Sequence, residues 1–387
     1  GARGPARIVA LNVLVFQAIL VATGILAVTL VSHWSYPIPL YYELLYIPLY
    51  ALFAAYAGEQ LLNRWRPRRP ALALLLPALL LTPAAFFLVN RDAPERQFPI
   101  PSAGSPLTDR LERDIGIAPG RAFAGRVVSM IAGKTFDEQE QYFYAVDHAT
   151  GNDHFHTGLW LHDIPTLTEY NQLLTPAFFW FTEQFLQEKP GEQRRNWINF
   201  SRLNLPALRL LGVRYILTPD TAIPEAALRE TLPVKGKPNL NLFELDKVNT
   251  NGVFVTQAIS VHGLAEAKDA IAASFAAPAA VLLGEEKLPP LIAGRDSHIE
   301  IERGGWHITA RSDGASLLIV PFEYSRCLDL TVHNGPPPQA IRADAVLTGL
   351  LFDRTLDVTM AARVGEFHRP DCRWQDYKEF RRLMQQP

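Results

Sequence analysis

The chain has 387 residues, a net charge of −2 and 20% charged side chains. This length is enough for more than one domain with its own core. Because basic residues are not in excess, the composition provides no general attraction for nucleic acid, and we expect no nucleic-acid partner. The charges are unevenly distributed: residues 1–89 contain only two carboxylates, Glu43 and Glu59, whereas acids and bases alternate from Asn90 onward. The sequence therefore predicts an apolar N-terminal region followed by a water-exposed remainder.

Three apolar segments in the N-terminal region predict membrane-spanning helices. Residues 8–31 contain no charged side chain. As a helix they would be about 36 Å long, enough to cross a hydrocarbon core of about 30 Å. Residues 40–62 and 71–89 are weaker candidates because they contain carboxylates or prolines. We therefore expect residues 1–90 to form an α-helical membrane anchor of about three spans, with the lipid bilayer as a partner.

Basic residues around these segments predict their orientation. Arg3 and Arg7 precede the first segment, and the loop between the first and second segments has no basic side chain other than His33. The loop between the second and third segments contains Arg64, Arg66, Arg68 and Arg69. Because arginine-rich loops stay in the cytoplasm, everything after Asn90 is expected on the opposite side. In a bacterium this predicts a protein of the cytoplasmic (inner) membrane with a large periplasmic domain.

Cysteine usage is compatible with this location. The only two cysteines are Cys327 and Cys372, and both lie in the predicted exterior region. An oxidising compartment permits a disulfide between them, which we predict. The alternative is that they are two unrelated buried thiols.

After the anchor, the pattern predicts a linker and a mixed domain. Residues 91–120 are rich in proline, glycine and charge and are typical of a linker. Residues 121–295 combine helical and strand patterns and predict a soluble α/β domain. Within it, residues 205–211 predict a short helix that leads into a strand at 213–217, and residues 264–277 predict another helix.

The C-terminal part predicts a second domain of a different class. Short alternating segments, such as 299–303 and 306–310, are separated by turn signals such as Asp313-Gly314. Closely spaced short strands of this kind are typical of an antiparallel β-sandwich, which we place at residues 296–370. Residues 371–387 predict a C-terminal helix. The expected fold class is thus a helical membrane anchor, a soluble α/β domain and a C-terminal antiparallel β-sandwich.

Three stretches carry a resemblance to a known family. They are DIPTLTEYN at 163–171, LLGVRYILT at 210–218, and residues 314–324 with the Asn334-Gly335 turn. In this order they resemble the C-terminal portion of bacterial multi-pass membrane proteins of the YfhO type, in the GT-C group of glycosyltransferases. The resemblance covers most of residues 90–370, and its motifs are structural rather than catalytic.

The resemblance implies a function. The chain would be the C-terminal membrane and periplasmic part of a GT-C-like glycosyltransferase that acts with polyprenyl-phosphate sugar donors and a glycan acceptor. Its exterior domain would position the acceptor or the donor. The characteristic acidic residue of such enzymes lies in the first exterior loop, whereas residues 32–39 contain no carboxylate. We therefore assign no catalytic residue and expect the catalytic part upstream of Gly1. The alternative is a non-catalytic scaffold or assembly subunit that contacts other membrane subunits.

One segment has an unusual concentration of potential metal ligands. Imidazole and carboxylate groups bind divalent metals, and they cluster between residues 147 and 163. The sequence predicts a divalent-metal site from His148, Asp153, His154, His156 and His162. The alternative is a polar loop whose histidines make ordinary hydrogen bonds, because no established metal-ligand spacing is present.

Two further features have both a functional and a structural interpretation. Five arginines could bind an anionic lipid or a phosphate, or could pair with nearby acids such as Glu188 and Glu192. The aromatic run 178–181 could reach a membrane interface or pack in the core. The arginines are Arg194, Arg195, Arg202, Arg209 and Arg214.

Overall fold

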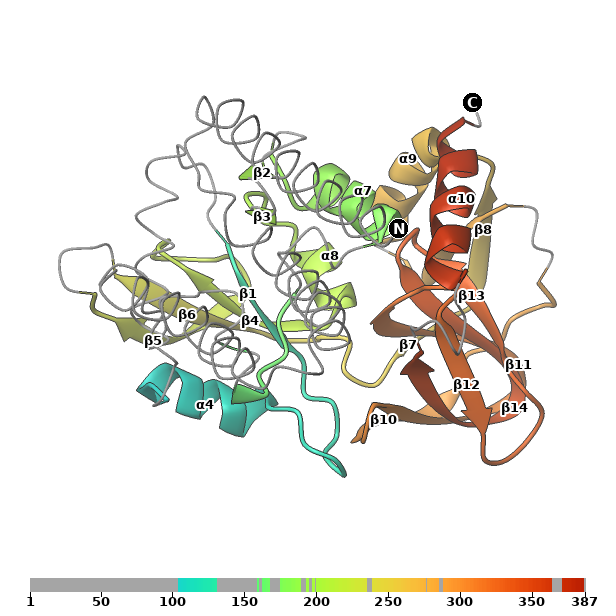
Figure 1. Ribbon diagram of the computed structural model, residues 1–387, viewed down its shortest axis with the longest axis horizontal. Helices are drawn as coiled ribbons and strands as arrows, with labels where there is room; N and C mark the ends of the chain where they lie inside the picture. Colours follow the sequence, from blue (N-terminus) through green and yellow to red (C-terminus); the bar gives the residue numbers. More distant parts are fainter. Residues whose placement is uncertain are drawn as a thin grey trace, which may run out of the picture. The chain divides into compact units, whose positions relative to one another are not determined.

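The structure is a computed structural model (Figure 1). It describes residues 104–130, 159, 162–167, 175–188, 193–194, 197–198, 200–234, 239–275, 277–284, 288–363 and 371–385. The chain divides into two compact units, Gly1–Gln97 and Phe98–Pro387, and all described residues belong to the second unit.

The described residues form five helices and a larger number of strands. The helices are α4 (Pro106–Ile115), α7 (Pro176–Phe185), α8 (Leu205–Leu210), α9 (Leu264–Ser274) and α10 (Cys372–Gln385). The strands of the first half are β1 (Arg126–Ser129), β2 (Gln193–Arg194), β3 (Trp197–Ile198), β4 (Val213–Thr218), β5 (Ala226–Leu232) and β6 (Leu240–Leu245). The others are β7 (Val253–Val255), β8 (Gln257–Val261), β9 (Ala279–Leu283), β10 (Arg295–Glu302), β11 (Gly305–Glu323), β12 (Leu328–Val332), β13 (Gln339–Ala343) and β14 (Leu347–Ala362).

The smaller main sheet has the strand order β1-β4-β6-β5 and is covered on both faces. β1 pairs with β4 in parallel, and the other pairs are antiparallel. One face packs on α4 through Leu107, Leu111 and Tyr215. The other carries Ile216 and Phe243 into the same core as α7 and α8. Burial on both sides explains why β4 reads as an almost continuous apolar run rather than an alternating one.

Helix α4 is defined by local signals at both ends. Ser105 caps it, because its side chain accepts a hydrogen bond from the N–H of Thr108, and the Thr108 hydroxyl is 2.6 Å from the N–H of Ser105. Pro106 occupies the first turn, where its missing N–H costs nothing. At the other end, the Tyr215 hydroxyl donates to Asp114 at 2.9 Å and ties the helix to β4.

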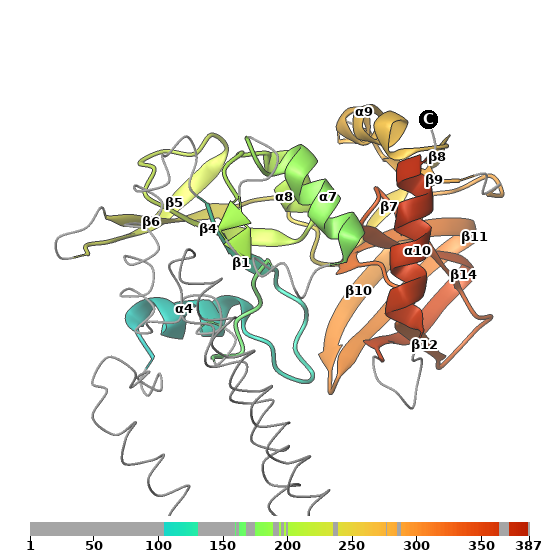
Figure 2. The same cartoon turned by 45° about the horizontal axis from the view of Figure 1, so that its top comes forward.

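The larger sheet has eight strands built around one long antiparallel pair, β11 and β14. Its order is β10-β11-β14-β13-β9-β8, with β12 added beside β14 and β7 beside β11. Successive residues of β11 point to opposite faces: Leu318 and Val320 enter one core cluster, and Leu317 and Ile319 enter another. The second cluster also contains side chains of α7, α9 and α10, so these helices cover that face (Figures 1 and 2).

The expected fold class is wrong. Of the described residues, 42% lie in strands and 24% in helices. None of the described helices is long and apolar enough to cross a membrane. The three predicted spans, at 8–31, 40–62 and 71–89, lie outside the described residues. The separate α/β domain and sandwich are replaced by mixed sheets, because β7, β8 and β9 join the same sheet as β10 to β14.

Local predictions agree better with the structure than the predicted class does. The helices expected at 205–211 and 264–277 correspond to α8 and α9, and the terminal helix to α10. The turn expected at Asp313-Gly314 is absent, because β11 continues through it. A shift of register between Arg311 and Ala315 accommodates the glycine as a bulge instead.

Candidate ligand-binding site

A cavity of about 310 Å³ lies where α7, α10 and the ends of several strands meet. Segments far apart in the chain form its wall: β1, the start of α7, the end of β11, the start of β14 and the first turn of α10. Its polar lining consists of Arg126, Thr166, Thr175, Glu323, Ser325, Arg373 and Asp376. It therefore combines the concave shape and the few convergent polar groups that are typical of a ligand site.

Arg126 supplies a cation to this cavity. Its backbone N–H donates to the carbonyl of Gly212 at 2.8 Å, which fixes the start of β1. The guanidinium lies over the rings of Phe123 and Phe322, 5.6 Å and 5.5 Å from their centroids. Burial lowers the pKa of Arg126 to about 10, and the nearby charge of Glu323 opposes this shift. The side chain remains a cation at neutral pH and lies against two aromatic rings.

Glu323 supplies an anion from the last position of β11. Its carboxylate accepts a hydrogen bond from the N–H of Thr175 at 3.1 Å, and Thr175 is the N-cap of α7. Burial raises the pKa of Glu323, and the hydrogen bonds from Thr175 act in the opposite direction. Glu323 and Arg126 keep part of their surface accessible, and both face the cavity. A polar ligand can therefore reach both charges.

Aromatic side chains form an apolar wall. The ring of Trp306 stacks on that of Phe322, with centroids 4.1 Å apart and an interplanar angle of 24°. Both residues line the cavity, together with Phe178 of α7. The site thus offers ring faces beside charged groups.

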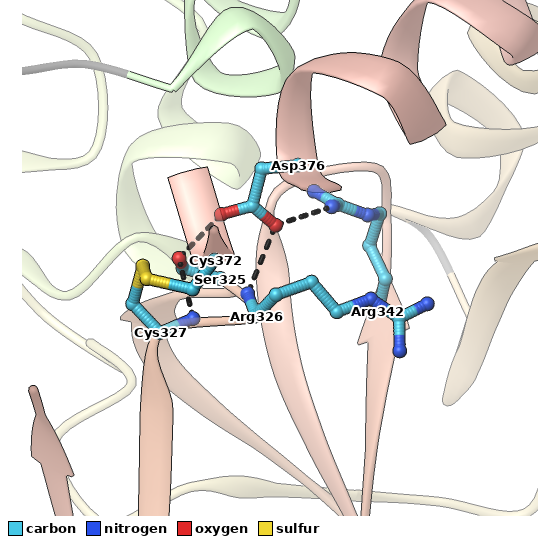
Figure 3. Close-up of a disulfide and its surroundings, with 6 residues drawn as sticks. All are labelled: Ser325, Arg326, Cys327, Arg342, Cys372 and Asp376. Carbon is cyan, nitrogen blue, oxygen red and sulfur yellow. Dashed lines mark hydrogen bonds and ion pairs between the residues drawn. A yellow bond between two sulfur atoms is a disulfide. The ribbon is translucent and has the colours of Figure 1, made fainter. Parts of the chain in front are cut away.

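A disulfide holds α10 against this site (Figure 3). Cys327 and Cys372 are bonded, with Cα atoms 5.0 Å apart, so the predicted disulfide is confirmed. One helical turn later, Asp376 accepts hydrogen bonds from the Ser325 hydroxyl and from the N–H of Arg326. These contacts fix the first turn of α10 as one wall of the cavity.

A second cavity, of about 270 Å³, contains a buried carboxyl group. Asp344 is 2% exposed and accepts a hydrogen bond from the N–H of Val281 at 2.9 Å. Burial raises the pKa of Asp344 to about 7, and the hydrogen bond from Val281 opposes this shift. The remaining wall mixes apolar side chains, such as Phe275 and Ile319, with polar ones, among them Arg209 and Lys247. Its one carboxyl group is buried, whereas the first cavity combines accessible charges with stacked aromatic rings, so this cavity is a weaker ligand-site candidate than the first.

Most of the predicted metal site cannot be placed. His148, Asp153, His154 and His156 lie outside the described residues. His162 is described, and its Nε2 atom is buried without a hydrogen-bond partner within the described part. No group of three or more potential ligands that could hold a metal occurs among the residues that the structure places. The metal site stays a prediction.

For the five arginines, both anion binding and pairing with acids were considered, and those whose side chains are described make contacts within the fold. Arg209 pairs with Glu225 at 2.9 Å and Asp246 at 2.8 Å, and Arg214 pairs with Glu244 at 2.7 Å. The Arg202 guanidinium donates to backbone carbonyl groups. In the aromatic run, Phe178 and Phe181 are buried in the core.

The sequence did not identify Arg126, Glu323 or Asp376 as site residues. Each is a single charged residue inside or next to an apolar strand or helix face, and such residues are common at element ends. Only Asp376 could have been identified from the local sequence, because it lies four residues after Cys372 and hence on the same helix face as the predicted disulfide.

Comparisons with known proteins provide no further assignment. No family model, curated protein or solved structure matches the chain significantly. The function is therefore inferred from the geometry and the sequence.

Proposed function

We propose that the described domain binds a carbohydrate unit in the cavity between Arg126, Glu323 and Trp306. In this proposal the chain is part of a GT-C-like glycosyltransferase that uses lipid-linked sugar donors, and the domain positions the acceptor or the donor. Sugar transfer itself is assigned to residues outside the described part. The proposal is carried by one observation, which is that a single cavity contains both aromatic faces and opposite charges.

The chemistry of the lining suits a sugar ring. A pyranose has C–H groups that pack on an aromatic face and hydroxyl groups around its rim. The Trp306–Phe322 stack provides the aromatic face. Glu323 can accept hydrogen bonds from hydroxyl groups, and the guanidinium of Arg126 can donate to them. A volume of about 310 Å³ is at the lower end of the usual range for ligand pockets, which favours one or two sugar units over a long glycan.

The stretches that resemble the YfhO-type proteins all contribute to this cavity. The first provides Thr166 and Leu167, the second provides Leu211, and the third provides Phe322 and Glu323. Sequence stretches about 40 to 150 residues apart thus meet around one space. This convergence supports a shared binding role for the motifs.

The disulfide supports a periplasmic location. Disulfides form and persist in oxidising compartments and are rare in the cytosol. The Cys327–Cys372 bond closes a loop of the described domain beside the cavity. We therefore propose that this domain faces the periplasm, where lipid-linked sugars are used by enzymes of this group.

Saturation-transfer NMR on the full chain tests the proposal. The probes are glucose, galactose, mannose and N-acetylglucosamine, presented separately. We expect at least one to bind, and we expect Glu323→Gln to weaken that binding about 10-fold, because it removes a charged acceptor. Glutamine retains an oxygen that can accept the N–H of Thr175, so the fold is preserved.

Glu302→Gln is the matched control. Glu302 lies in the same sheet and accepts one hydrogen bond, from Thr359 at 2.8 Å, but does not line the cavity. Its substitution should leave sugar binding unchanged. If no sugar of the panel binds, or if Glu323→Gln and Trp306→Leu both bind as the parent does, the carbohydrate proposal is wrong. The non-catalytic scaffold would then be favoured.

A further inference from the structure

Helix α10 presents a distinct outer face. Its inner face consists of Cys372, Asp376, Phe380 and Leu383, which are buried. On the outer face, Trp374 is 53% exposed, Tyr377 42% and Met384 62%. The other large hydrophobic side chains that are exposed in the described residues are scattered over different loops and strands. Exposed apolar side chains are thus concentrated on this one helix.

The charges of α10 are separated by sign between its two faces. The acids point inward: Asp376 is 3.5 Å from Arg342, and Glu379 is 2.8 Å from Arg326. Lys378, Arg381 and Arg382 are exposed and form no ion pair with a described residue, whereas the exposed Arg373 lines the cavity and is not counted in this face. One exposed acid, Asp371, precedes the helix. Because the whole chain has a net charge of −2, this basic face is a local feature.

The aromatic and basic side chains of the outer face are arranged together. The rings of Trp374 and Tyr377 stack with centroids 5.2 Å apart, and the ammonium of Lys378 lies 5.3 Å from the Trp374 centroid. Positions 374, 377, 378 and 381 follow one helical stripe. The disulfide and the inward ion pairs hold the helix in place, so this face is already formed before any partner binds.

We propose that the outer face of α10 binds the surface of an anionic lipid bilayer. Tryptophan and tyrosine side chains favour the headgroup region, and exposed lysines and arginines are attracted to anionic headgroups. Met384 extends the apolar stripe by a further turn. The helix lies on the bilayer surface and does not cross it. This inference does not depend on the carbohydrate proposal, because it uses a different face and different residues.

Quenching of Trp374 by brominated lipids tests the inference. The full chain is mixed with vesicles of brominated phosphatidylcholine, either alone or with an equal part of brominated phosphatidylglycerol. The difference in quenching between the parent and Trp374→Phe isolates Trp374, whatever the rest of the chain does. We expect Trp374 to be quenched by the anionic vesicles, much less by the zwitterionic ones, and less at high salt.

Lys378→Gln/Arg381→Gln removes two cations from the face. The lipid concentration for half-maximal quenching of Trp374 should rise about 30-fold, since each cation contributes about fivefold. Arg303→Gln/Arg311→Gln is the matched control, because it removes two exposed cations from β11 and the turn before it. The control should bind as the parent does. Absent quenching of Trp374, or equal quenching by both kinds of vesicle, would overturn the proposal.

Discussion

The carboxylate of Asp376 lies 3.5 Å from the guanidinium of Arg342, and their side chains are only 4% and 6% exposed. This pair joins α10 to β13 beside the disulfide (Figure 3). The guanidinium also lies 3.4 Å from Glu379 and 4.5 Å from the centroid of the Tyr324 ring. Such a buried pair is costly to break, because the remaining charge loses its partner away from water.

Asp376→Asn should therefore lower the free energy of unfolding by about 3 kcal/mol, toward the lower end of the range for buried pairs, because Glu379 still faces Arg342. Urea denaturation followed by circular dichroism measures the change. Asp371→Asn is the control, since this acid is exposed just before the same helix and should cost little. Equal effects of the two substitutions would contradict a buried, energetically important pair.

Removal of the disulfide should also destabilise the domain. The bonded cysteines are 45 residues apart, and closure of a loop of that length restricts the unfolded chain by about 4 kcal/mol in the chain-entropy estimate. Cys327→Ala/Cys372→Ala should lower the melting temperature, and dithiothreitol should lower that of the parent but not that of the double variant. Detection of two free thiols in the non-reduced parent would show that the bond does not form.

Asp344 should make stability depend on pH. Burial raises its pKa from 3.8 to about 7. Between these values the folded protein keeps a proton that the unfolded chain has released, so the free energy of unfolding falls as the pH rises through this interval. Asp344→Asn cannot ionise, and its side-chain carbonyl can still accept the Val281 N–H. Asparagine also tolerates the positive φ of 48° at this position.

Asp344→Asn should thus exceed the parent in stability at pH 8, by at most about 4 kcal/mol, and match it near pH 4. Urea titrations of both proteins at the two pH values measure the difference. A constant difference at both values would mean that Asp344 does not titrate in this range.

Gly212 should tolerate no side chain. Its φ is +77°, and an added Cβ would be 3.0 Å from the Cβ of Pro321 and 3.2 Å from the carbonyl oxygen of Asn249. We expect Gly212→Ala to cost about 2–3 kcal/mol, because strain in the left-handed region adds to crowding. Gly304→Ala is the matched control, since Gly304 has a φ of +85° with no atom within 4 Å of an added Cβ. Gly304→Ala should lower the free energy of unfolding by only about 1 kcal/mol, measured by thermal or urea unfolding. A similar loss for both substitutions would show that crowding at Gly212 is not important.

Several local structures were predictable because their causes lie within a few residues. Helix α9 follows from apolar positions at helical spacing, and the sharp change from helix α8 to strand β4 follows from Gly212 between them. The disulfide was predictable because the chain has only two cysteines and both lie in its C-terminal part. Local interactions of this kind do not depend on where the rest of the chain lies.

The sheets were not predictable in this way. The pattern at 313–314 is a strong turn signal, yet pairing with β14 along the length of β11 outweighs it. Likewise, β7 to β9 lie within residues 121–295, which were predicted as a separate α/β domain, but they belong to the same sheet as β13. Strand pairing depends on segments far away in the chain, and the apolar periodicity of a strand does not identify the strand with which it pairs.

The two proposed binding sites, the outer face of α10 and the cavity lined by Arg126 and Glu323, differ in how far the sequence determines them. The amphipathic character of α10 is determined by its local sequence, because the spacing of Trp374, Tyr377 and Lys378 places them on one side of any helix. The cavity is different, because Arg126, Glu323 and Asp376 come from three distant segments. Only packing of the two main sheets and α10 brings these charges around one space, since burial of apolar side chains sets the arrangement of elements and the charged groups follow.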